Sequence, residues 1–229
     1  MKRARSIAAL IAGVFLILTA TAAQSYRAET FAAPPPAEVS AAMRGMLSEN
    51  AIRIVSEKGT LCEVWVVRAV PVQANPSPQL GVILPELAEG TLIGVVRFRT
   101  EGEDYRRQSV PPGVYTMRYA LHPVDGNHQG VAPQRDFLLL VPAAADGDPG
   151  RMPLAELYAQ SQKASGTTHP SVWSLVPAET AGAGALPAVT HHAEEDLWIV
   201  TFAVSGQAES GAPRQLRISL VFAGHAPEA

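Results

Sequence analysis

One stretch of this sequence gathers side chains that could bind a ligand or a metal. Residues 124–137 read VDGNHQGVAPQRDF and lie between two segments with the apolar character of strands. Imidazole and carboxylate groups bind Zn or Cu, and a guanidinium beside them could orient a carboxylate or a sugar. A second segment, ASGTTHPSVW (residues 164–173), is also polar and contains a histidine. The candidate ligand-binding residues are His122, Asp125, Asn127, His128, Arg135, Asp136 and His169.

Two histidines of this set, His128 and His169, are the candidate metal ligands. The turn at residues 125–127 uses its Asp, Gly and Asn to shape its own backbone, but it does not require His128. If the two loops meet at one rim of the fold, both imidazoles and Asp125 could hold Zn or Cu. A metal-dependent hydrolase would also need an open coordination position and a general base such as Asp125 or Asp136.

The same residues also have a purely structural interpretation. His122 precedes Pro123 and could simply end a strand. The histidines could cap loops, and Arg135 with Asp136 could form a surface ion pair worth about 0–1 kcal/mol. The sequence alone leaves both interpretations open.

Motifs of common catalytic sites are missing, which favours a non-enzymatic protein without deciding the question. The sequence has no Gly-x-Ser-x-Gly elbow and no phosphate-binding loop. His191 and His192 are not followed by a second histidine at the spacing of a zinc-binding helix. Cys62 is the only cysteine, so no internal disulfide can form, and its alternation with Val64 predicts a buried thiol.

The first 23 residues predict export. Three basic residues precede an apolar run at residues 7–20, and small residues follow it at a possible cleavage point. We therefore expect a periplasmic or extracellular protein with no transmembrane span after cleavage, the alternative being an uncleaved anchor. Cleavage after Ala23 would leave 206 residues and change the formal charge from −3 to −6. An acidic chain disfavours nucleic acid as a partner.

Predicted strands and two short helices must position the candidate loops. Residues 24–36 end in three prolines and predict an extended, Pro-rich N-terminal arm. Apolar residues at helical spacing predict helices at 37–49 and 153–166. Alternating or continuous apolar runs predict strands at 51–56, 60–70, 90–100, 113–121, 136–142, 171–177, 196–204 and 214–222.

This order of elements predicts a mainly β protein. About eight strands with two short helices and proline-rich connections favour an antiparallel, jelly-roll-like β-sandwich. Strands and helices do not alternate regularly, which argues against an α/β fold. We expect residues 37–229 to form a single domain.

Three segments carry a resemblance to known proteins. LCEVWVVRAVP, PPGVYTMRYALHPVDGNHQGVAPQRDFLLLVPAAAD and KASGTTHPSVW resemble a group of exported bacterial proteins of unknown function, over about residues 50–225. The phrase VPPGVYTMRY resembles the strand entry of secreted β-sandwiches of the prealbumin or collagen-adhesin type, which are Ig-like in character. The resemblance implies a secreted β-sandwich and carries over no catalytic residue.

The function expected from these observations is a non-enzymatic binding or accessory module. Its unknown small ligand would bind at the rim made by loops 122–136 and 165–171. One alternative is a Zn- or Cu-binding protein, or a hydrolase, built on His128 and His169. Another is a subunit of a cell-envelope complex, held by its partner protein through the N-terminal arm and the first helix.

Overall fold

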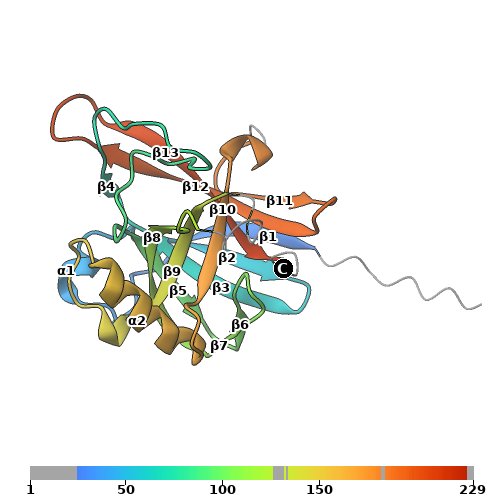
Figure 1. The fold of residues 1–229 in the computed structure, drawn as a ribbon. Helices are drawn as coiled ribbons and strands as arrows, with labels where there is room; N and C mark the ends of the chain where they lie inside the picture. The colour runs from blue at the N-terminus through green and yellow to red at the C-terminus, as the bar shows by residue number, and fades with distance from the viewer. Residues whose placement is uncertain (1–24, 126–131, 133, 182–183, 226–229) are drawn as a thin grey trace, which may run out of the picture.

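β-Strands are the main secondary structure of the chain (Figure 1). The structure, a computed structural model, describes residues 25–125, 132, 134–181 and 184–225. Two α-helices, α1 (Ala41–Arg44) and α2 (Leu154–Ser165), and two short 3-10 turns, η1 (Ala143–Ala145) and η2 (Ala178–Ala181), accompany the strands. The strands are β1 (Tyr26–Ala32), β2 (Asn50–Ser56), β3 (Gly59–Val66), β4 (Ala69–Pro71), β5 (Leu92–Phe98), β6 (Gly102–Glu103), β7 (Ser109–Val110), β8 (Gly113–Leu121), β9 (Asp136–Pro142), β10 (Val172–Val176), β11 (Ala188–His192), β12 (Leu197–Gln207) and β13 (Arg214–Ala223).

All these strands except the β6–β7 hairpin belong to one large sheet. Its order is β1-β2-β3-β5-β8-β9-β10-β13-β12-β11, with β4 paired to β12. Neighbours are antiparallel except β4 and β12, which run parallel. Strand β10 pairs with β9 through Val172–Ser174 and with β13 from Leu175 onward, so it carries the sheet from one half to the other.

The sheet curls until its two ends touch. Strand β1 contacts β11, and the Tyr26 ring packs edge-on against Trp198 at 5.0 Å and Phe222 at 5.1 Å between ring centroids. The main hydrophobic cluster draws on both halves, for example on Val96 of β5 and Ile218 of β13. The mainly β class is therefore confirmed, and the strands form one large, curled, mixed sheet.

Several strands of the structure were not predicted. Residues Tyr26–Ala32, expected in the extended arm, pair with β2 as strand β1. Strands β6, β7 and β11 were also missed, because two- to five-residue strands show too few alternations to give a periodic signal. The single strand predicted at 60–70 divides into β3 and β4. The predicted hairpin at 51–70 and the strands at 90–100, 113–121, 136–142 and 171–177 correspond to observed strands.

The two predicted helices are both present, with different outcomes. Helix α2 matches its prediction and ends at Gly166, whose positive φ of 66° suits the left-handed residue that follows a helix. Helix α1 has only four residues, capped by the Ser40 side chain, although the predicted apolar residues Val39, Met43 and Leu47 are buried. None of the helices in the described ranges is long and apolar enough to cross a membrane.

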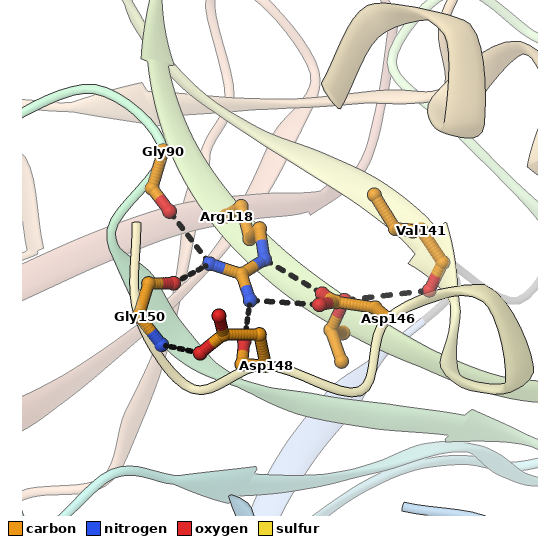
Figure 2. Close-up of polar contacts among 7 residues, drawn as sticks. Gly90, Arg118, Val141, Asp146, Asp148 and Gly150 are labelled. Atoms are coloured by element: carbon orange, nitrogen blue, oxygen red, sulfur yellow. Dashed lines mark hydrogen bonds and ion pairs between the residues drawn. The ribbon is translucent and has the colours of Figure 1, made fainter. Parts of the chain in front are cut away.

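A fully buried arginine joins the sheet to the segment that leads into α2 (Figure 2). Arg118 of β8 donates Nε and Nη2 to the two carboxylate oxygens of Asp146, at 2.6 and 2.7 Å. Its remaining N–H groups bond to the main-chain oxygens of Gly90, Asp148 and Gly150. All five donors of the guanidinium are therefore satisfied.

This arrangement determines where α2 begins. The Arg118 contacts hold residues 146–150 against β8, and Met152 N donates to Gly90 O at 3.2 Å. Helix α2 starts two residues later and lies across β9, where Leu157 packs among buried residues of β9 (Figure 1). The position of α2 is thus set by a bidentate ion pair in the protein interior.

We predict that Asp146→Asn destabilises the protein by about 3–5 kcal/mol, because it leaves a buried guanidinium without its counter-charge. Urea unfolding measures the change. Asp148→Asn is the matched control: Asp148 contributes its main-chain oxygen to Arg118, and an amide oxygen can still accept from Gly150 N. Equal losses in the two variants would contradict the role assigned to Asp146.

Candidate ligand pocket between the two histidine loops

A pocket of about 330 Å³ lies between α2, the turn at residues 104–108, the segment that follows β8 and the loop that precedes β10. Its apolar walls come from Pro123, Phe137, Pro170 and Val172. Aromatic and polar side chains complete it: Tyr105, Arg106, His122, Tyr158, Gln162 and His169. His122 and His169, two of the residues singled out in the sequence, therefore lie at the same cavity.

A buried carboxylate holds the 104–108 turn in place. Asp104 is 2% exposed, and its oxygens accept from Arg106 N at 2.8 Å, Gln108 N at 2.9 Å, Gln108 Nε2 at 2.7 Å and Val172 N at 3.1 Å. Burial raises the pKa of Asp104, and the four N–H donors offset this only in part. The turn that carries Tyr105 and Arg106 is thus fixed to the start of β10.

The loop that carries His169 is tied to the same turn. Gln108 Nε2 donates to Pro170 O at 2.9 Å, and Thr167 Oγ1 donates to Gln108 Oε1 at 2.6 Å. His169 N donates to Thr167 Oγ1 at 3.0 Å, and His169 O accepts from Ser165 Oγ at 2.6 Å. The backbone of His169 is therefore held, while its exposed ring has no hydrogen-bond partner within the described part of the chain.

His122 is positioned by its backbone and by an aromatic neighbour. His122 N donates to Arg135 O at 2.8 Å, and Arg135 Nε donates to His122 O at 2.8 Å. The His122 ring lies 4.3 Å from the Phe137 ring between centroids, at an angle of 36°. This contact places an imidazole against the apolar floor of the pocket.

Arg135 and Asp136 serve a different purpose from the one predicted. Arg135 N donates to Gly81 O at 2.9 Å, and the buried Asp136 accepts from Ile83 N at 2.9 Å and Leu84 N at 3.0 Å. Neither residue lines the pocket. They anchor the irregular connection at residues 72–91 to the sheet.

The Asp136 carboxylate has a further buried partner. Tyr119 of β8 donates its hydroxyl to Asp136 Oδ1 at 2.6 Å. Burial raises the pKa of Tyr119, and the charge of Asp136 raises it further, so this phenol stays neutral. The expected orientation of a ligand by an Arg–Asp pair therefore gives way to a structural role for both residues.

The remaining candidates do not complete a metal site in the described residues. Asn127 and His128 lie outside the residues that the structure describes. Asp125 is exposed. Among the described residues, no group of three or more His, Cys, Asp or Glu side chains could hold a metal ion. The Zn or Cu site on His128 and His169 stays a prediction.

Four residues that bring polar groups to the pocket were missed in the sequence. Tyr105 and Arg106 lie on the turn between β6 and β7, strands of two residues each that leave no periodic pattern. Tyr158 and Gln162 lie on the face of α2 that meets the pocket. An apolar helix face containing Tyr158 was predicted, but nothing in the sequence indicated that this face would leave a cavity.

Comparison of the chain with models of protein families, with curated proteins and with solved structures gave no match. The resemblance to exported bacterial proteins therefore stays a prediction. The function has to be argued from the chemistry of the site itself.

We predict that Asp136→Ala destabilises the protein by about 2–4 kcal/mol, because it leaves buried N–H groups and the Tyr119 hydroxyl without an acceptor. His169→Ala removes an exposed ring and changes stability by less than about 0.5 kcal/mol. Chemical unfolding compares the two variants. A large loss from His169→Ala would show that this histidine is a structural cap and not a residue free to bind.

Proposed function

We propose that this chain is an exported, non-enzymatic binding protein that holds one small organic ligand in the pocket between its two histidine loops. The observation that carries the proposal is the placement of His122 and His169, from separate loops, at one cavity with apolar walls. Small-molecule sites commonly combine such walls with a few polar groups, and a volume of about 330 Å³ lies at the small end of their range.

Side-chain groups without protein partners support a binding role. Arg106, His169 and Tyr158 line the pocket, and their guanidinium, ring and hydroxyl have no hydrogen-bond partner among the residues described here. The guanidinium of Arg118 and the carboxylate of Asp104, in contrast, are fully bonded within the fold. Polar groups left unpaired beside an apolar cavity are available to a ligand.

The proposal includes the location and the finer fold. The basic and apolar residues at positions 1–23 support export to the periplasm or the cell exterior. The two halves of the curled sheet, joined by β10, would correspond to the two layers of a jelly-roll-like sandwich. Their shared hydrophobic cluster supports this view.

The alternative of a cell-envelope subunit loses its main argument. An apolar surface on the first helix would have favoured such a partner. Val39, Met43 and Leu47 are instead 2%, 0% and 0% exposed, so this face already packs on the sheet.

We predict that the neutral, planar probe 2-naphthamide binds to the pocket with a Kd of about 1 mM. With roughly 0.3 kcal/mol for each of about 13 non-hydrogen atoms, the binding free energy is about −4 kcal/mol. Ligand-observed NMR measures the affinity. His169→Trp fills the mouth of the pocket and weakens binding at least about fivefold.

Thr168→Trp is the matched control for this experiment. Thr168 is an exposed neighbour of His169 that does not line the pocket, and its contact with Gln162 uses the main-chain oxygen. The control should bind the probe like the original protein. Equal weakening by both substitutions, or no binding to the original protein at millimolar concentration, would contradict the proposed site.

A further inference from the structure

We propose that the ligand is an organic carboxylate with a flat apolar body, and that Arg106 is its counter-ion at the mouth of the pocket. This inference rests on the proposed function and specifies the ligand of the same site.

The walls of the pocket select the body of the ligand. Phe137 and Val172 are 2% and 7% exposed and provide its apolar lining together with two prolines. The His122 ring, tilted against Phe137, adds a second flat surface. A planar hydrocarbon or aromatic body gains most from contact with such surfaces, because aromatic rings bury a large apolar area with few rotatable bonds.

Arg106 is an unusual arginine in this protein. Its backbone N donates to Asp104 Oδ1 at 2.8 Å, but its guanidinium has no partner in the described ranges. Within these ranges, every other arginine except Arg44 bonds through its side chain to a carboxylate, a main-chain oxygen or an imidazole. Among the described residues, the guanidinium of this pocket-lining arginine thus has no acceptor, which supports a contact with an acceptor on a ligand.

The other polar groups at the pocket also favour an acceptor. Burial raises the pKa of the Tyr158 hydroxyl and the charge of Glu89 raises it further, so the phenol is neutral and can donate. The His169 ring offers a further donor. Among the described residues, no Asp or Glu belongs to the pocket lining, and the oxygens of the buried Asp104 beneath the turn are taken by four N–H groups. An anion is therefore favoured over a cation.

A carboxylate suits this set of donors better than a neutral amide does. A guanidinium has only donors, and it binds a carboxylate through two parallel hydrogen bonds. An amide presents one oxygen and two N–H groups, and its N–H groups would face the N–H groups of Arg106. Two ligands of equal shape, one with a carboxylate and one with an amide, make the same apolar contacts. The difference between their affinities therefore measures the contribution of the charge contact.

The test compares 2-naphthoate with 2-naphthamide on the full mature chain by ligand-observed NMR. We expect naphthoate to bind about tenfold more tightly, the value for one partly exposed charge-assisted contact. Arg106→Gln should remove this preference, so that the two probes bind this variant equally, and Arg106→Lys should keep part of the preference. Arg107→Gln is the control. It removes one positive charge from the neighbouring residue, whose side chain contacts His225 outside the pocket.

Each other outcome overturns a defined part of the inference. Equal or tighter binding of the amide to the original protein would refute the carboxylate ligand while leaving the proposed pocket intact. A preference for naphthoate that survives Arg106→Gln would refute Arg106 as the counter-ion. Failure of both probes to bind, with the protein folded by circular dichroism, would refute the proposed function together with this inference.

Discussion

A guanidinium that is cut off from water must find an acceptor for each of its five N–H groups, and this requirement organises the core of the protein. Arg118 meets it with one carboxylate and three main-chain oxygens from two separate segments. One segment contains Gly90 and precedes β8 in the sequence, and the other, residues 146–150, follows β9. The contacts of Arg118 therefore join two connecting segments that do not pair as strands. Helix α2, one wall of the pocket, starts directly after this junction.

Buried carboxylates repeat the same principle around the pocket. Asp104 collects four N–H groups and fixes the turn with Tyr105 and Arg106, while Asp136 collects two backbone N–H groups and one hydroxyl. Because these two carboxylates are fully bonded inside the fold, they offer no free acceptor to the pocket. The polar groups of the described lining are then mainly hydrogen-bond donors, such as those of Arg106 and Tyr158. The same contacts that build the frame therefore determine the chemistry of the cavity.

Long strands and the second helix were predictable because their apolar periodicity extends over many residues. Residues 136–142 are apolar on both faces, as a strand in the middle of a sheet requires, and Gly166 marks the end of α2. The polar loops beside them were predicted to form a binding rim, and two of their histidines line one pocket. Histidine patterns without a motif could not show which of the other residues are structural.

Long-range partners explain what the sequence left hidden. Glu63 alternates like an exposed residue, yet it is 1% exposed and forms ion pairs with Arg53 of β2, Arg97 of β5 and Arg99, which follows β5. In the sequence, Asp136 resembles one partner of a surface ion pair with Arg135. In the structure it is buried and accepts hydrogen bonds from the backbone N–H groups of residues 83 and 84, which are distant in sequence. Such contacts depend on the final arrangement of strands, which local periodicity does not determine.

The most direct test of the proposed pocket follows the histidine ring signals by NMR during a titration with 2-naphthoate. We predict that the signals of His122 and His169 move together and saturate at the same ligand concentration, because both residues line one pocket. The signals of His191 and His192, on β11 and outside this pocket, should stay in place. Movement of the β11 histidines, with those of the two loops unchanged, would contradict the proposed pocket.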